Sequence, residues 1–266
     1  MNQNKDKDPG EDKDRQYVTA LARGLQILRC FSATTPSLGT SEIARMTGLA
    51  QPTVWRLCYT LIQEGYLVQM DRKDKLRPGI PVLGLGFSAI ASLPIGELAR
   101  AQMQALADKH QGAVSLGMRD GAAMVYVQRC QGSEIVLRDM SIGSRVPILS
   151  SVTGWAWLAA LPTPEREAAL AELQRDEPAL FETMLPRLTE ALQTYALTGY
   201  VVNKGSLHPQ INAVGVPVMS SDGKMRLALS SGGISQWFDD AKLAHIGAEL
   251  RALAQELGAA LSAQSR

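Results

Sequence analysis

The segment from Thr40 to Leu67, TSEIARMTGLAQPTVWRLCYTLIQEGYL, limits the fold more than any other part of the chain. Thr40 can accept an N-cap hydrogen bond, and Glu42 falls in the first turn, where the helix dipole favours a carboxylate. Gly48 can adopt the left-handed conformation that ends a helix. The segment therefore begins with a short helix and a sharp turn.

A longer helix follows, from Gln51 to about Gly65. Pro52 suits its first turn because proline has no N–H to leave unpaired there, and Gln51 can act as the cap. One face of this helix is polar and the other apolar: Gln51, Thr53, Arg56, Tyr59, Thr60 and Gln63 lie opposite Val54, Leu57, Cys58, Leu61 and Ile62. A short helix, a tight turn and a longer helix predict a helix-turn-helix, whose second helix enters the major groove of DNA.

The flanking residues predict a winged helix. Thr19 can cap a preceding helix at about residues 18–32, in which apolar residues recur every three or four positions. After the second helix of the pair, residues 66–70 have a strand-like pattern, residues 71–74 form a charged turn, and the chain returns through Leu76. Four cations gather at this hairpin: Arg72, Lys73, Lys75 and Arg77. Such a wing suits phosphates or a minor groove.

The charge is unevenly distributed along the chain. Residues 17–82 contain eight basic and four acidic side chains, a net charge of +4, while residues 1–16 carry −1 and the remainder −2. A basic segment on a slightly acidic body indicates a nucleic-acid module joined to a domain with another role. The first 16 residues have mixed charges and no apolar core of a signal peptide, so we expect a disordered tail.

Side-chain chemistry divides the expected contacts with double-stranded DNA. Gln51 can bond adenine through its amide, Thr53 can touch a thymine methyl group, and Arg56 can reach either guanine or a phosphate. The remaining members of the set are expected to hold the DNA backbone or shape the helix tip. The full set is Thr40, Ser41, Gln51, Pro52, Thr53, Arg56, Tyr59, Thr60, Arg72, Lys73 and Lys75. We expect Trp55, in contrast, to pack against the first helix or the wing.

The cysteines indicate a reducing compartment. Cys30, Cys58 and Cys130 are odd in number and far apart, which argues against a disulfide framework or a zinc knuckle. We therefore expect a cytoplasmic protein. Cys30 and Cys58 fall on apolar helix faces and are interpreted as core residues.

A connector without charge joins the basic segment to the rest of the chain. Residues 79–96, GIPVLGLGFSAIASLPIG, are interrupted by Pro81 and Pro94 and fall short of the roughly 20 apolar residues of a membrane span. We expect no membrane association. We interpret residues 81–94 as a linker helix that pairs between protomers.

The second half predicts an α/β domain. Two hairpins are centred on Asp120-Gly121 and Asp222-Gly223, and a further strand is expected at residues 134–142. Helices are expected from Gly96 to His110, after residue 152 and over residues 164–196, with an amphipathic helix at the end of the chain. This pattern predicts a mixed sheet that can support a ligand cavity.

Four segments in this order resemble the IclR family of bacterial transcription regulators. They are ALARGLQILRCF, the helix-turn-helix segment, GSRVPILSSVTGWAWLAAL, and LTGYVV followed by INAVGVPVMSSDGKMRLALS. The resemblance implies a winged helix-turn-helix domain at residues 17–80, a linker helix at 81–94 and a GAF-like effector-binding domain at 95–266. It also implies dimers or dimers of dimers that bind a pseudo-palindromic operator.

The resemblance implies a pocket for a small organic acid. Its expected residues are Met118, Ser150, Ser151, Thr153, Gly154, Trp155, Asn203, Ala213, Ser230 and Gly232, with Ser231 as the alternative to Gly232 if the alignment slips by one. The helix N-terminus near Gly154 would hold a carboxylate on backbone N–H groups. Trp155 stands where the family commonly has lysine, and Asn203 where it often has aspartate, which favours an acid with a hydrophobic or aromatic body. For Trp155, packing and a pocket role stay equally open, whereas Trp157 is expected to pack.

Other classes of function have weaker support. The sequence lacks GxSxG, HExxH and phosphate-binding glycine motifs, and His110, His208 and His245 are scattered over separate elements. We therefore expect no enzyme activity, cofactor or metal, with a hydrolase using Ser150 and His208 as a remote alternative. A regulator whose second domain only oligomerises stays open as well.

Overall fold

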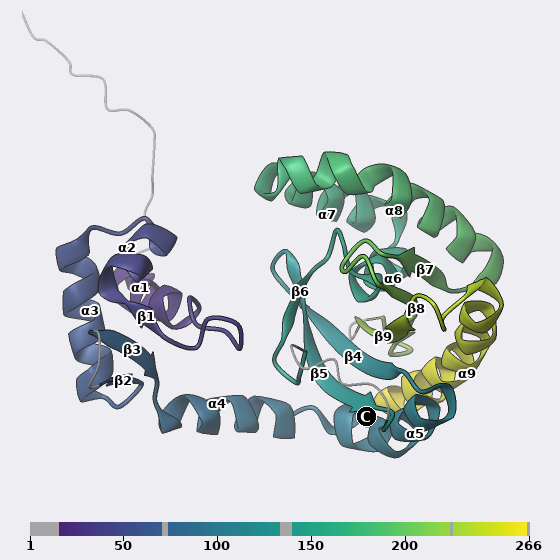
Figure 1. The fold of residues 1–266 in the computed structure, drawn as a ribbon, viewed down its shortest axis with the longest axis horizontal. Coiled ribbons are helices and arrows are strands. Elements are labelled where there is room, and N and C mark those ends of the chain that lie inside the picture. Colours follow the sequence, from purple (N-terminus) through teal and green to yellow (C-terminus); the bar gives the residue numbers. More distant parts are fainter. Residues whose placement is uncertain (1–15, 71–73, 134–139, 224–225, 265–266) are drawn as a thin grey trace, which may run out of the picture. The chain divides into compact units, whose positions relative to one another are not determined.

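The computed structural model describes residues 16–70, 74–133, 140–223 and 226–264, and the chain separates into two compact units, residues 1–87 and 88–266 (Figure 1). Each unit has its own hydrophobic core. The units are therefore described one at a time.

The first unit is a small helical domain with a three-stranded antiparallel sheet. Its elements are α1 (Thr19–Leu28), β1 (Leu38–Gly39), α2 (Thr40–Thr47), α3 (Gln51–Gln63), β2 (Leu67–Gln69) and β3 (Lys75–Pro78). The strand order is β1–β3–β2. Every element contributes to one core, made by Ile27, Leu38, Ile43, Val54, Cys58, Leu67 and Leu76. Burial of Cys58 confirms the prediction that it is a core residue.

The predicted helix-turn-helix is present, but its caps differ from the expectation. Gly48 ends α2 in the left-handed conformation at φ 69°, as predicted. The cap of α2 is Gly39 and not Thr40, and the carboxylate of Glu42 accepts the backbone N–H of Gly39 at 2.7 Å. The cap of α3 is Ala50, so Gln51 is already helical. The caps of both helices therefore lie one residue before the expected ones.

The wing is the β2–β3 hairpin, and β1 adds a third strand that was not expected. The strands close tightly at their base, because a Cβ on Gly79 would lie 1.9 Å from the carbonyl oxygen of Gly65. Only glycine fits at position 79. Arg72 and Lys73 lie outside the described residues.

A helix of apolar residues follows the wing. It is α4 (Ile80–Ala91), close to the expected linker helix, and the next helix, α5 (Pro94–His110), starts after a short break. Ile80, Leu83 and Phe87 lie on one stripe of α4 and are 69–77% exposed. None of the described helices has by itself the length and apolar character of a membrane span, and α4 and α5 reach them only when counted together across the bend between them.

The second unit is built on a six-stranded sheet. Its strands are β4 (Ala113–Asp120), β5 (Ala123–Gln131), β6 (Arg145–Pro147), β7 (Val201–Lys204), β8 (Ile211–Met219) and β9 (Arg226–Ile234). They are ordered β6–β5–β4–β9–β8–β7, and all described pairings are antiparallel, which corrects the expected mixed sheet. Both predicted hairpins form, as β4–β5 and β8–β9. The strand expected at 134–142 lies mostly outside the described residues.

Helices cover both faces of this sheet (Figure 1). The helix α5 lies beside α9 (Asp240–Gln264) on one face, while α6 (Val152–Ala160), α7 (Thr163–Asp176) and α8 (Pro178–Thr198) pack on the other. Along β9, Leu227 and Leu229 pack toward α5 and α9, whereas Ala228 packs toward α6. This alternation decides which side chains can face a cavity on the α6 side.

Candidate functional site

The outward face of α3 carries most of the residues expected to contact DNA. Five of the six expected on this helix are exposed and Thr53 is half-buried: Gln51, Pro52, Arg56, Tyr59 and Thr60 point away from the core. Val54 and Cys58 on the opposite face are buried. The buried side fixes the rotation of the helix, so the outward face is presented in one orientation.

The start of α3 is tied to the start of α2 by side-chain hydrogen bonds. The amide nitrogen of Gln51 donates to the hydroxyl oxygens of Thr40 at 3.0 Å and Ser41 at 3.4 Å. The three side chains form one polar group at the tip of the helix-turn-helix. Hydroxyl and amide groups of this kind bond phosphates as well as base edges.

Trp55 does not pack as expected. It is 59% exposed and stacks on Tyr59, which is 53% exposed, with ring centroids 5.8 Å apart and an interplanar angle of 20°. Residues four apart on a helix are neighbours, so the pair forms a flat aromatic surface beside Arg56. The apolar periodicity of α3 did not distinguish an exposed tryptophan from a buried one.

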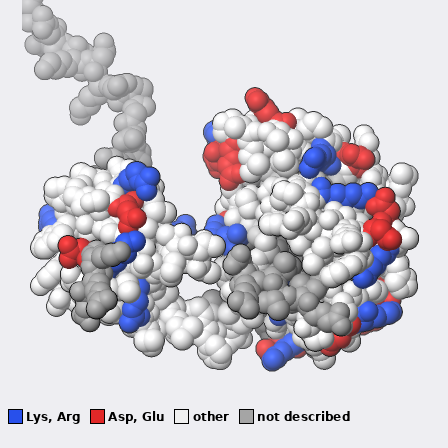
Figure 2. Space-filling model, viewed as in Figure 1, with Lys and Arg blue, Asp and Glu red and all other residues white. Residues whose placement is uncertain are grey.

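Basic and acidic groups alternate around the wing. The ammonium of Lys75 lies 3.7 Å from the carboxylate of Glu42. The hydrogen bond from the backbone of Gly39, followed by the charge of Lys75, holds the pKa of Glu42 below its ordinary value. On the side shown in Figure 2, the described basic side chains of this unit are interspersed with acidic ones.

A cavity of about 400 Å³ opens on the α6 side of the second unit's sheet. Strand and helix residues line it together with the loop before β8: Ala113, Ser115, Tyr126, Arg129, Met140, Val152, Asn203, Leu207, His208, Ile211, Ala213, Ser230 and Gly232. Four of the ten expected effector-binding residues are among them, namely Asn203, Ala213, Ser230 and Gly232. The floor is made of small side chains, which leaves room above the sheet.

Arg129 lines this cavity, although it was not predicted from the sequence. The register of β4 against β5 shifts between Leu116 and Gly117, leaving Val127 as an extra residue. Such a bulge reverses the alternation of side chains, which places both Tyr126 and Arg129 on the cavity face. Periodicity alone would have put these two residues on opposite faces.

The guanidinium of Arg129 is held in a largely apolar environment. It donates to the hydroxyl oxygen of Ser115 at 2.6 Å and lies 5.6 Å from the ring centroid of Tyr126. Burial lowers the pKa of Arg129, but an arginine stays charged in proteins. Burial also raises the pKa of the Tyr126 hydroxyl, against the opposing effects of Arg129 and Thr153. The cavity therefore offers one fixed positive charge beside an aromatic ring.

The alternation along β9 separates Ser231 from Gly232. Ser230 and Gly232 line the cavity, whereas Ser231, 1% exposed, pairs with Val114 and Val214 on strands whose valines pack toward α5 and α9. A Cβ on residue 232 would lie 3.0 Å from the Cβ of Ala213. Of the two alternatives, Gly232 is the one at the cavity.

At the start of α6 only Val152 lines the cavity, and the neighbouring residues that were expected there do not. Ser151 caps the helix by accepting the Gly154 N–H at 3.1 Å, and a Cβ on Gly154 would lie 2.3 Å from the carbonyl oxygen of Ile148. Trp155 is 1% exposed and donates its indole N–H to the Leu149 carbonyl at 2.7 Å. The expected residues that do not line the cavity are Met118, Ser150, Ser151, Thr153, Gly154 and Trp155. Met118 packs on the opposite face of the sheet.

Two further expectations concern Trp157 and Asn203. Trp157 packs as predicted, 6% exposed with Arg119 over its ring at 4.9 Å. The Asn203 amide donates to the Ser150 carbonyl at 2.9 Å and accepts the Ser206 N–H at 3.1 Å, so its polar atoms hold two loops. Asn203 thus shapes the cavity wall.

Comparison with known proteins identifies both units. The family profile described as IclR helix-turn-helix domain matches residues 20–71, and that described as bacterial transcriptional regulator IclR C-terminal matches residues 87–259. The HTH-type transcriptional regulator TsaQ1/TsaQ2 of Comamonas testosteroni is 32% identical over 75% of this chain and 72% of its own length. The HTH-type transcriptional regulator XynR of Escherichia coli is 27% identical over 92% of this chain and 96% of its own.

Solved structures of IclR family regulators have the same fold as this chain. An IclR family transcriptional regulator from Brucella abortus has 37% sequence identity and a TM-score of 0.86, covering 96% of both chains. An IclR homologue from Microbacterium hydrocarbonoxydans, complexed with 4-hydroxybenzoate, shares the fold with a TM-score of 0.68 at 20% identity over 90% of this chain and 97% of its own. The winged helix-turn-helix, the cavity-bearing second unit and these matches make the chain a member of the IclR family of transcriptional regulators, with a DNA-binding helix-turn-helix domain and an effector-binding C-terminal domain.

Proposed function

We propose that this regulator binds a pseudo-palindromic operator as a dimer or a dimer of dimers, and that an organic acid with a hydrophobic or aromatic body controls its affinity for DNA. The observation that carries the effector class is the guanidinium of Arg129 in the wall of a largely apolar cavity. An arginine fork matches a carboxylate in shape and charge.

The cavity fits the rest of such a ligand. Its volume of about 400 Å³ lies within the range of small-molecule sites. With the carboxylate on Arg129, the body of the acid meets Tyr126, Leu207 and Ile211. The start of α6 is capped by Ser151 and is buried. The proposed partner of the carboxylate is therefore Arg129 and not the N-terminus of this helix. The relative that was solved with 4-hydroxybenzoate holds a ligand of the same chemical class.

The two alternatives have less support. A domain that only oligomerises would have its cavity filled by side chains, and the bulky side chain of Trp155 is buried outside the cavity, against Leu149. A hydrolase would need Ser150 beside His208. Of this pair only His208 lines the cavity, and among the hydrogen bonds of the described residues none joins the two.

On the DNA side, we propose that α3 lies in the major groove. In that position Gln51, Thr53 and Arg56 would meet base edges, and Tyr59, Thr60 and the wing cations would hold the DNA backbone. The polar group formed by Gln51 with Thr40 and Ser41 adds a fixed donor and acceptor array at the helix tip. Two copies of α3 then read two half-sites about one helical turn apart.

Calorimetry with a panel of acids tests the effector class. We expect benzoate-type acids to bind more tightly than glyoxylate or pyruvate, and replacement of Arg129→Met to weaken binding of the preferred acid by about 10- to 100-fold, since a charged hydrogen-bond partner is lost. Arg145→Met is the matched control, because Arg145 is half-exposed and pairs with Asp120 away from the cavity. Tight binding of only the smallest acids, or equal loss in both variants, would contradict the proposal.

A further inference from the structure

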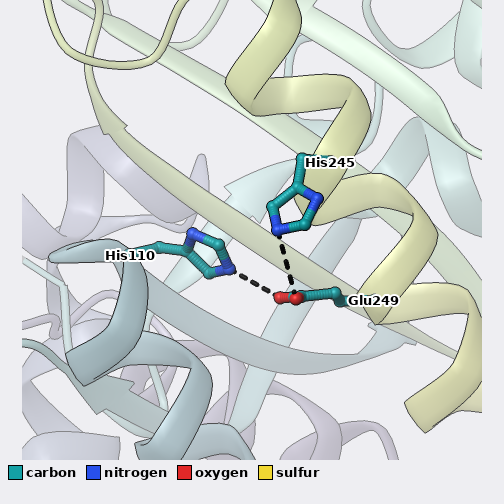
Figure 3. Close-up of side chains that lie close together, drawn as sticks. All are labelled: His110, His245 and Glu249. Atoms are coloured by element: carbon teal, nitrogen blue, oxygen red, sulfur yellow. Dashed lines mark hydrogen bonds and ion pairs between the residues drawn. The ribbon is translucent and has the colours of Figure 1, made fainter.

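We propose that His110, His245 and Glu249 form a binding site for a divalent transition-metal ion of the zinc class. The imidazole Nε2 of His110 lies 2.6 Å from one carboxylate oxygen of Glu249, and the Nε2 of His245 lies 3.3 Å from the other (Figure 3). The three side chains come from two helices and converge on one point, with all ligand atoms within 4.8 Å of one another. Two of the histidines that the sequence scatters over separate elements are thus brought together.

The two helices hold these groups in place. His245 and Glu249 are one turn apart on α9, so they project from the same face, and His110 is the last residue of α5. About two turns from this cluster, Gln102 of α5 donates to Glu256 of α9 at 3.1 Å, which also fixes the two helices against each other. The imidazole rings meet edge to face at 5.7 Å.

The burial of the three groups suits a site that is preformed and open to an ion from solvent. His110 is 7% exposed and Glu249 23%, whereas His245 is 61% exposed. Two inner ligands are therefore held rigidly, and the outer one can close over an ion.

Two imidazole nitrogens and a carboxylate oxygen are a donor set for zinc and its neighbours. Tetrahedral zinc with bonds of about 2.0–2.2 Å keeps its donors roughly 3.3–3.5 Å apart. The Nε2 of His245 and the Oε1 of Glu249 already have that separation. The Nε2 of His110 and the Oε2 of Glu249 would move apart by less than about 1 Å. A water molecule would complete the coordination, as in open zinc sites.

Lys109 is the group that an ion must displace. Its ammonium is paired with the same carboxylate of Glu249, which already interacts with both histidines. The Lys109 side chain is 56% exposed, so it can move into solvent when an ion arrives. This competition gives the proposal a prediction that a purely structural ion-pair network does not share: removal of Lys109 should tighten metal binding.

The experiment uses the full chain after treatment with a chelator. Zinc is titrated by calorimetry, and the melting temperature is followed with and without the ion, which stabilises a folded state that binds it. We expect His245→Ala to weaken zinc binding at least about tenfold, since even groups that only support a ligand change metal affinity by that much. His208→Ala is the matched control because His208, the third histidine, lies outside the cluster and should leave zinc binding unchanged.

Two further measurements decide the assignment. Lys109→Met should bind zinc more tightly than the wild type, and the Co²⁺ form should lack the charge-transfer absorption of a thiolate ligand, which excludes the three cysteines as the site. The proposal is overturned by absence of zinc binding to the wild type, by equal affinity of His245→Ala, by weaker binding to Lys109→Met, or by a thiolate band.

Discussion

Gly154 is a residue whose identity is set by close packing. Its Cα lies so near the backbone of Ile148 that a methyl group would meet the carbonyl oxygen at 2.3 Å. We expect Gly154→Ala to lower the stability of the second unit by about 1–3 kcal/mol, because backbone and not a flexible side chain must move. Gly24→Ala, at a helical glycine with nothing within 4 Å, should be neutral or stabilising by up to about 1 kcal/mol. Chemical denaturation of both variants measures the difference, and equal effects would contradict the packing argument.

The thiol of Cys58 should be inert in the folded protein. Burial, with a smaller effect of neighbouring Cys30, raises the pKa of Cys58 to about 11. Because the thiolate reacts and the thiol does not, deprotonation must wait until the pH approaches that value. At pH 8 we expect iodoacetamide to modify Cys58 at least about 100-fold more slowly in the native state than after unfolding in guanidinium. Peptide mass spectrometry follows the label, and comparable rates in the two states would refute the assigned burial.

The positions of individual side chains were the least predictable from the sequence. Trp55 was expected to pack, yet it is exposed. Helix periodicity predicts which face a residue occupies only when that face is wholly polar or wholly apolar, so it did not determine the position of Trp55. Arg129 was missed because the extra residue Val127 reverses strand alternation, and a bulge leaves no periodic signal. His110 and His245 are 135 positions apart, so only tertiary packing of two helices brings them together.

At the scale of elements, α3 and the wing should contribute to DNA binding in different ways. Replacing Arg56→Ala removes a side chain of the outward face of α3, and we expect altered base preference of about 1–3 kcal/mol at one operator position. Selection from a random-sequence DNA library, followed by affinity measurements on single-base variants, gives this quantity. Equal weakening for every base would mean that Arg56 contacts a phosphate.

The wing should instead act on all sequences alike. Replacing both Arg72 and Lys73 with alanine removes two cations, so binding should weaken uniformly and the slope of log affinity against log salt should fall by about two. Anisotropy titrations over a range of salt concentrations measure the slope. A changed base preference with an unchanged slope would assign base reading to the wing.

Helices with a strong apolar periodicity were predictable from the sequence, whereas strand pairing was less predictable. The apolar series of α9, Leu243, Ile246, Leu250, Leu253 and Leu257, is buried throughout as expected. The turns at Gly48 and Gly121 adopt the left-handed conformation that their positions required. Strand β1, only two residues long, has no periodicity to detect, and the antiparallel arrangement of the larger sheet depends on pairings between distant segments.

At the scale of the whole molecule, α4 is the candidate for pairing between protomers. Ile80, Leu83 and Phe87 form an exposed apolar stripe that a solvated helix would not keep. We expect Leu83→Glu with Phe87→Glu to lower the mass of the assembly toward the 28.7 kDa of one chain, since two like charges would face each other across the pair. Leu197→Glu is the matched control, because Leu197 is 89% exposed on α8 without such a stripe. Sedimentation equilibrium distinguishes the variants, and an unchanged mass in the double variant would exclude pairing through α4.

The coupling between cavity and operator gives a test that does not depend on whether bound DNA represses or activates transcription. If an acid in the cavity changes operator affinity by some factor, the operator must change the affinity for that acid by the same factor, typically about 5- to 150-fold. Operator anisotropy with and without acid gives the first factor, and calorimetry of the acid with and without operator gives the second. At an acid concentration that saturates the wild type but not Arg129→Met, the acid should no longer change the operator affinity of Arg129→Met, whereas Arg145→Met should respond like the wild type, because only the first residue lines the cavity. A wild-type factor of one, with the acid bound, would leave the second unit as an oligomerisation domain whose cavity does not communicate with α3.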